Sequence, residues 1–144
     1  MNAAETVVKR DIWIAAPRER VWQAVTNAEM IMKWWGDTWI INALKVGGGI
    51  EFGRPGDMIH ATIAVLDPPR QFSIHWPWQE QYQAENAYTI FDLAEENNGT
   101  RVTVTETGYE ALSGEERQER LNRTGQGYTT VLANLKAYVD GSKA

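Results

Sequence analysis

The stretch that decides the fold is residues 113–140, which read SGEERQERLNRTGQGYTTVLANLKAYVD. Apolar or small residues recur there in alternating steps of four and three, the spacing of one side of an α-helix. These positions are Leu121, Gly125, Tyr128, Leu132, Leu135 and Val139. Most charged residues of the stretch fall outside this stripe, where they can face water. A helix with one apolar side needs a broad surface to cover, so we expect it to lie across a sheet built by the preceding residues.

Both ends of the predicted helix are marked. Ser113 and Glu116 have the spacing of a capping box, in which the serine accepts from a first-turn N–H and the glutamate reaches back. Gly141 stands where helices commonly end on a glycine. Gly125 and Gly127 are unusual, because a glycine inside a helix costs roughly 1 kcal/mol relative to alanine. Two interpretations stay open: a kink or close contact with a strand, or space for a ligand between helix and sheet.

The totals restrict the class of protein. The chain has 144 residues, 23% of them charged and 43% hydrophobic, and we expect residues 1–144 to form a single domain. A net charge of −5 disfavours a nucleic-acid binder, which needs a basic face. The absence of cysteine excludes disulfides, thiolate catalysis and zinc–thiolate sites. There is no apolar signal region or bilayer-spanning apolar run, so we expect a cytoplasmic protein without a membrane span.

The first third of the chain predicts one strand and two helices. Residues 7–14 are rich in β-branched and aromatic residues and predict a first strand. Pro17 suits the first position of a helix, and Asn27 separates that helix from a second, shorter one. The second helix carries Trp34 and Trp35, two of seven tryptophans in the chain.

The middle of the chain predicts strands. They are expected at 38–44, 50–52, 58–66, 70–78, 87–93 and 100–107. The clearest is 70–78, in which Phe72, Ile74, Trp76 and Trp78 alternate with Ser73, His75 and Pro77. The last two form a hairpin around residues 95–99, in which Asn98-Gly99 is a strong turn signal. The predicted order is β-α-α-β(5–6)-α, an α+β fold in which a curved antiparallel sheet wraps around the C-terminal helix and leaves an internal cavity.

Several motifs carry a resemblance to a known family. They are residues 16–22 (APRERVW), 33–36 (KWWG), 46–49 (VGGG), 67–70 (DPPR) with Trp76, 99–105 (GTRVTVT), and Gly127-Tyr128 with Leu132, Leu135 and Tyr138. The sequence resembles the Bet v 1-like, START-related (SRPBCC) superfamily and is most similar to its Aha1-like group, the homologues of the Hsp90 ATPase activator. The resemblance covers nearly the whole chain and implies the helix-grip fold. Tyr128 stands where the family often has Trp, and Glu106 where it often has His.

The resemblance also implies a cavity between the sheet and the long helix. Its expected walls are Trp34, Trp35, Trp39, Phe52, His60, Trp76, Trp78, Glu106 and Tyr128. For the tryptophans, packing in the core or at the rim is the alternative to lining a flat, apolar ligand. His60 has a structural or surface role as its alternative, and His75, which alternates away from Trp76, is expected to be exposed.

Glu106 is the most informative polar candidate. Alternation with Val102 and Val104 points it inward, and a buried carboxylate costs several kcal/mol unless it is paired. The interpretations are a salt bridge to an arginine such as Arg54, a solvated end, a polar anchor for a ligand, or an acid/base group. Because only two histidines are present and no cysteine, a metal site is not expected, and neither is a cofactor.

Three functions remain open on this evidence. The favoured one is binding of a small hydrophobic molecule, aromatic or lipid-like, in the cavity. The second is a protein interaction with an Hsp90-type chaperone ATPase, which the resemblance implies. The third is a cyclase or proton-transfer enzyme using Glu106, His60 or Tyr88, although no catalytic motif is legible. An exposed edge strand at 70–78 or beside it would also allow a homodimer.

Overall fold

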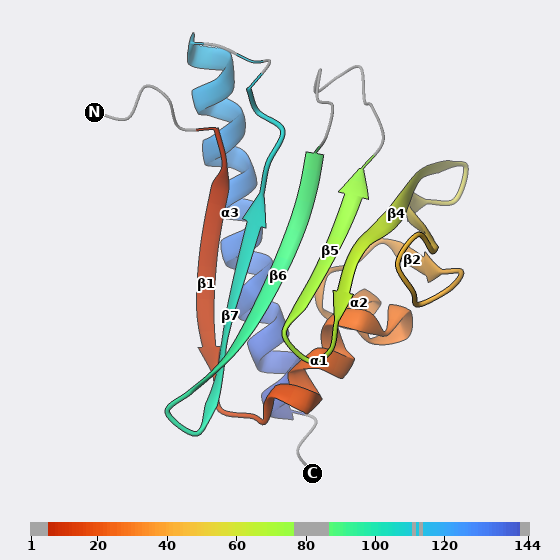
Figure 1. The fold of residues 1–144 in the computed structure, drawn as a ribbon. Coiled ribbons are helices and arrows are strands. Elements are labelled where there is room, and N and C mark those ends of the chain that lie inside the picture. The colour runs from red at the N-terminus through yellow and green to blue at the C-terminus, as the bar shows by residue number, and fades with distance from the viewer. Residues whose placement is uncertain (1–5, 77–86, 111, 113, 142–144) are drawn as a thin grey trace.

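The described part of the chain has an α+β fold with one antiparallel sheet and three helices (Figure 1). The structure, a computed structural model, describes residues 6–110, 112 and 114–141, except 77–86. The strands are β1 (Val8–Ile14), β2 (Thr38–Ile41), β3 (Gly49–Arg54), β4 (Asp57–Asp67), β5 (Gln71–Trp76), β6 (Ala87–Glu96) and β7 (Gly99–Glu106). The helices are α1 (Arg18–Thr26), α2 (Ala28–Trp34) and α3 (Gly114–Gly141).

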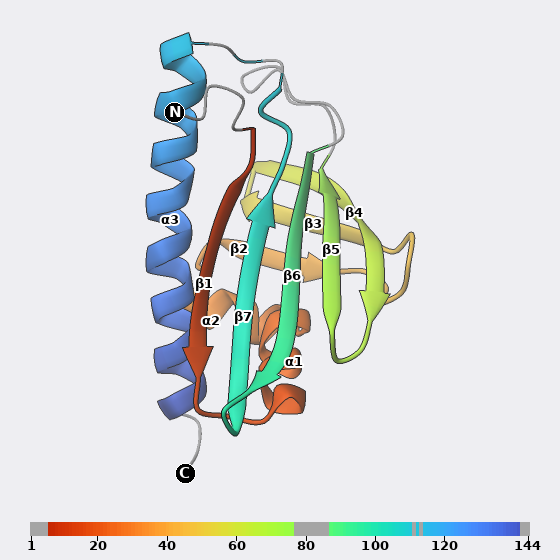
Figure 2. The same cartoon turned by 60° about the vertical axis from the view of Figure 1, so that its left-hand side comes forward.

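The sheet is curved, and its order is β1-β7-β6-β5-β4-β3-β2. In Figure 2 α3 runs along β1, while β2 and β3 cross the direction of β1, β7 and β6 at a steep angle. The helices α1 and α2 lie on the same side of the sheet as α3, and both contact α3. This arrangement confirms the helix-grip fold that the sequence predicted. No helix in the described part of the chain is both long and apolar enough to cross a bilayer.

The predicted apolar stripe of α3 is the side that the sheet buries. Leu121, Tyr128, Leu132, Leu135 and Val139 are all at most 6% exposed. They pack with inward-facing strand residues such as Ile14, Val102, Val104, Phe91 and Leu93, which are equally buried. Burying side chains of this size contributes roughly 1.5–3 kcal/mol each, so this contact is a main source of the stability of the fold.

The β6–β7 hairpin is present, and its turn lies within the predicted residues 95–99, one position before the Asn98-Gly99 pair. The turn residues are Asn97 and Asn98, with φ of 50° and 64°, as a two-residue type I′ turn requires. Gly99 is the first residue of β7 and is a glycine for another reason. A Cβ there would lie 2.4 Å from the Ile14 carbonyl oxygen and 2.7 Å from the Trp13 ring.

Other boundaries also differ from the prediction. The strand predicted at 38–44 ends at Ile41. Asn27 does cap α2, because its side chain accepts a hydrogen bond from the Met30 N–H. The capping residue predicted for the long helix, Ser113, lies outside the described residues, as does the end of the strand predicted at 70–78.

The two glycines inside α3 have different environments. A Cβ at Gly125 would lie 2.1 Å from Nη2 of Arg10, which points from β1 toward the helix. Gly125 therefore allows the helix to lie close to strand β1, which is the first of the two interpretations given for these glycines. At Gly127 nothing lies within 4 Å of the same position, so that glycine leaves space instead.

We predict that Gly127→Ala raises the free energy of unfolding by up to about 1 kcal/mol, because alanine is the better helix former and meets no neighbour. Gly125→Ala gains less or loses stability, because the Arg10 guanidinium must first move away. Urea denaturation of the two variants beside the unmodified protein measures both. A larger gain for Gly125→Ala than for Gly127→Ala would contradict this assignment.

Candidate functional site

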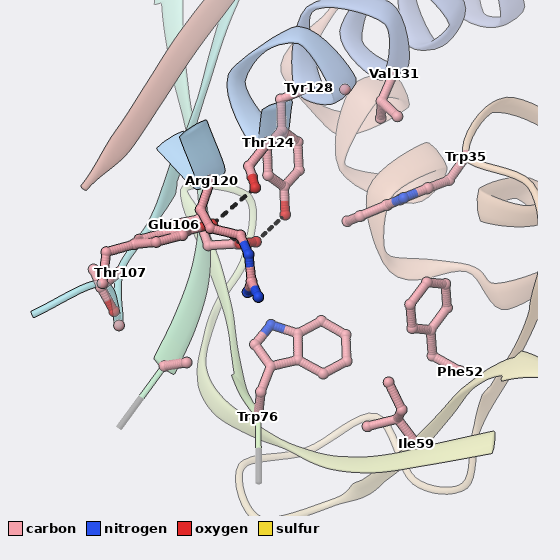
Figure 3. Close-up of a pocket in the computed structure, with 14 residues that line it drawn as sticks. Trp35, Phe52, Ile59, Trp76, Glu106, Thr107, Arg120, Thr124, Tyr128 and Val131 are labelled. Atoms are coloured by element: carbon pink, nitrogen blue, oxygen red, sulfur yellow. Dashed lines mark hydrogen bonds between the residues drawn. The ribbon is translucent and has the colours of Figure 1, made fainter. Parts of the chain in front are cut away.

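A pocket of about 320 Å³ lies between α3 and the concave face of the sheet (Figure 3). One part of its wall is apolar: Trp35, Phe52, Ile59, Trp76, Ala87 and Val131. The other part is polar: Glu106, Thr107, Tyr109, Arg120, Thr124 and the hydroxyl of Tyr128. Gly108 and Gly127 complete the lining. The volume lies at the small end of the range for ligand pockets in proteins.

The apolar part of the wall is built from aromatic rings that meet at tilted or edge-to-face angles. Trp35, at the end of α2, lies 5.7 Å from the Tyr128 ring on α3, measured between ring centroids. Phe52 on β3 lies 5.7 Å from Trp76 on β5. Trp39 stands behind them, 4.8 Å from Trp35 and 4.5 Å from Phe52, and is 2% exposed. Because three separate strands and two helices supply these rings, the shape of the wall depends on the whole fold.

The polar part of the wall is organised around the Glu106 carboxylate. Its Oε1 accepts hydrogen bonds from the Tyr128 hydroxyl and, at 3.0 Å, from Thr89 Oγ1. Its Oε2 accepts one from the Tyr109 hydroxyl at 2.8 Å, and Tyr109 also contacts Thr124 Oγ1 at 3.0 Å. Glu106 is therefore a half-buried acceptor held by three hydroxyl groups, which offset much of the cost of taking part of a carboxylate out of water.

Trp76 is joined to these hydrogen bonds through Thr89. The Trp76 indole N–H can only donate, and it donates to Thr89 Oγ1 at 2.8 Å. Because an ionised carboxylate can only accept, the Thr89 hydroxyl hydrogen is directed to Glu106. The orientation of the Trp76 ring, a wall of the pocket, is in this way coupled through Thr89 to the carboxylate.

Burial raises the pKa of the Tyr128 hydroxyl well above its ordinary value of 10.0, and the neighbouring charge of Glu106 raises it further. Tyr128 is therefore a neutral hydrogen-bond donor throughout the physiological range. Arg120 supplies the positive charge in the pocket lining, and in Figure 3 its guanidinium points toward the Trp76 indole.

The structure brings five of the nine predicted site residues to the pocket wall: Trp35, Phe52, Trp76, Glu106 and Tyr128. Trp34 and Trp39 are buried behind it, and the Trp34 indole N–H donates to the Ala24 carbonyl oxygen at 3.0 Å. Trp78 lies outside the described residues. That the five residues contact a ligand stays a prediction.

The placement of His60 in the cavity was wrong. Ala61 and Ile63 of β4 face the core, so alternation puts His60 on the outer face, where it is exposed opposite Glu51. The interpretation of Arg54 as a salt-bridge partner of Glu106 was also wrong, because Arg54 is exposed at the end of β3 and hydroxyls pair with the carboxylate instead. His75, expected to be exposed, is half-buried beside Tyr88, with ring centroids 4.9 Å apart.

Sequence reasoning missed Thr89, Tyr109, Arg120 and Thr124. Thr89 could have been found, because it alternates in phase with Phe91 and Leu93, which face inward. Three pocket residues of α3, Arg120, Thr124 and Val131, could also have been found. Together with Gly127 they form a second stripe with the same steps, one position before the core stripe that begins at Leu121. Tyr109 follows the last strand and has no periodic signal.

The family model described as Activator of Hsp90 ATPase homolog 1-like protein matches residues 15–140. Among solved structures, protein MLL2253 from Mesorhizobium loti superposes with a TM-score of 0.80 at 16% identity, over 96% of this chain and 99% of its own. The Aha1 dimer from Colwellia psychrerythraea gives 0.77 at 20% identity, over 97% and 100%. DynU16, from the dynemicin biosynthetic locus, gives 0.76 at 16% identity, over 94% and 48%. No curated protein matches the sequence.

We predict that Tyr128 ionises only well above pH 10 in the folded protein. The unfolded chain loses this proton near its ordinary pKa of 10.0 while the folded chain keeps it, so the stability contribution is present below pH 10 and lost as the pH rises further. An ultraviolet titration counts the tyrosines that ionise near pH 10 in the unmodified protein and in Tyr128→Phe. We expect the same count in both, because Tyr128 does not ionise in this range. A count that is lower by one in the variant would overturn the assignment.

Proposed function

The chain belongs to the Activator of Hsp90 ATPase homolog 1-like family, and on that premise we propose that its pocket binds a small hydrophobic molecule, aromatic or lipid-like. The observation that carries the proposal is a wall of aromatic rings that ends at a hydrogen-bonded carboxylate. Apolar surface for affinity with a few polar groups for orientation is the usual composition of small-molecule sites.

The missing side chain at Gly127 supports this proposal. A glycine in the interior of a helix costs roughly 1 kcal/mol relative to alanine, and no strand needs the space at this position. The glycine does contribute to the pocket lining. A larger side chain on this stripe of α3 would reduce the pocket. The cost in helix stability is explained if the space serves a ligand.

The proton-transfer alternative has less support. All three hydroxyl groups around Glu106 already donate to it, which suits a fixed acceptor rather than a base that must exchange a proton. His60, another group weighed for such chemistry, is on the outer face of the sheet. Tyr88 faces the same way, because its ring lies against His75.

We predict that native mass spectrometry of the freshly purified protein detects extra mass that disappears on denaturation. Gly127→Leu places a side chain in the pocket lining and is expected to lose this mass while remaining folded. Thr130→Leu, on the exposed side of the same helix, is the matched control and keeps it. Equal retention by Gly127→Leu would place the bound molecule elsewhere, and a bare spectrum for the unmodified protein would count against the proposal.

A second proposal is a protein contact at the β2 edge of the sheet. Ile40 on β2 and Leu44 and Val46 in the following loop are 42%, 49% and 63% exposed. An edge strand with apolar neighbours is open to pairing with another chain. The Colwellia dimer supports a second copy as the occupant, and the family description supports an Hsp90-type ATPase.

We predict that light scattering during size-exclusion chromatography finds a dimer and that Ile40→Lys shifts it toward the monomer, because a charge replaces apolar contact area. His60→Lys, exposed on β4, is the control. A monomer at every concentration would show that a second copy does not occupy this edge. In that case the monomer is tested for binding to a purified Hsp90-type ATPase. Binding that is lost in Ile40→Lys would identify the chaperone as the occupant.

A further inference from the structure

We propose that the ligand is a neutral aromatic molecule that carries a hydroxyl group, and that this hydroxyl donates a hydrogen bond to Oε2 of Glu106. The inference rests on the proposed binding function and specifies the chemical class of the ligand. It follows from the hydrogen bonds and charges around the pocket.

The Glu106 carboxylate has room for one more donor. An ionised carboxylate offers about four acceptor positions over its two oxygens. Within the described part of the chain, Oε1 accepts from Thr89 and Tyr128, whereas Oε2 accepts from Tyr109 alone. Because Glu106 is part of the pocket lining, the fourth position is available to a ligand there. That ligand must bring its own hydrogen, since a carboxylate cannot donate.

The charges of the described lining residues favour a neutral ligand. Glu106 contributes one negative charge and Arg120 one positive charge, and the Arg120 guanidinium also pairs with Glu116 at 3.9 Å. Tyr128 stays neutral, as its raised pKa indicates. An anionic ligand would be repelled by the carboxylate it has to approach, and Arg120, which already pairs with Glu116, offsets little of this cost. A cationic ligand would be attracted by Glu106, but it would have to leave its water and share the pocket with the Arg120 guanidinium.

The walls specify a flat ring. Trp35, Phe52 and Trp76 present ring faces and edges around the space next to Glu106 (Figure 3). Aromatic pairs gain from offset or edge-to-face contact beyond the burial of their area. A volume of about 320 Å³ corresponds to roughly ten water molecules, which is enough for one or two rings. An aromatic hydroxyl satisfies both parts of the wall: the ring lies on the aromatics, and its hydrogen reaches the carboxylate.

Isothermal titration calorimetry with three probes tests this class: 2-naphthol, which is neutral and donates; 2-methoxynaphthalene, which cannot donate; and 2-naphthoate, an anion. We expect 2-naphthol to bind at least about tenfold more tightly than either of the others, the usual effect of one hydrogen bond to a charged acceptor. Equal affinities, or tightest binding of 2-naphthoate, would overturn the inference while leaving the proposed binding function intact. If no probe binds, both fail.

Two variants test whether the preference for 2-naphthol depends on the Glu106 carboxylate. In Glu106→Gln the amide oxygen is expected to take the place of Oε1, next to two donors, which puts the NH₂ group at the position of Oε2, where it cannot accept. The preference for 2-naphthol over 2-methoxynaphthalene should then fall toward one. Glu51→Gln is the matched control, because it makes the same substitution on the outer face of β3, opposite His60. It should retain the preference; loss of the preference in Glu51→Gln, or its retention in Glu106→Gln, would contradict the assignment to Oε2.

Discussion

The pocket depends on the hydrogen bonds that three hydroxyl groups make to the half-buried carboxylate of Glu106. An ionised side chain that loses part of its water is stabilised when other groups pair with it or donate hydrogen bonds to it. Here the donors come from three different elements: Thr89 from β6, Tyr109 from the segment after β7, and Tyr128 from α3. The carboxylate therefore links the long helix to the sheet. It is also linked to Trp76 through Thr89, so the polar and the aromatic parts of the wall form one structure.

The helix α3 has two parallel roles along its length. The stripe from Leu121 to Val139 is buried and holds the helix on the sheet. The neighbouring stripe, from Arg120 to Val131, faces the pocket and carries a glycine at its centre, Gly127. Stability and ligand space are thus assigned to adjacent sides of one helix. A substitution on one stripe is expected to affect mainly the property that belongs to it.

Most of the fold could be predicted from the sequence because periodicity determines which side of an element is buried. The helix stripe, the β6–β7 hairpin and the alternation that puts Phe72, Ile74 and Trp76 on one face of β5 followed from spacing alone, and the structure buries that face. The strand that carries His60 was predicted correctly, but the face of the sheet on which His60 lies was not. A shift of one residue along a strand exchanges its two faces. The hydroxyl partners of Glu106 could not be derived, because they depend on how β6, β7 and α3 meet in space. Tyr109 in particular lies outside any regular element.

The measurement that tests this account most directly is a double-mutant cycle on the two donors to Oε1, Thr89→Val and Tyr128→Phe, with free energies of unfolding from urea denaturation. If both hydroxyls stabilise one carboxylate, the cost of the double variant differs from the sum of the single costs by at least about 0.5 kcal/mol. Thr100→Val combined with Tyr128→Phe is the control and should be additive, because the Thr100 hydroxyl donates to the Ala16 carbonyl oxygen, away from Glu106. Additive costs in both cycles would show that the hydroxyls do not share the carboxylate and would contradict the account.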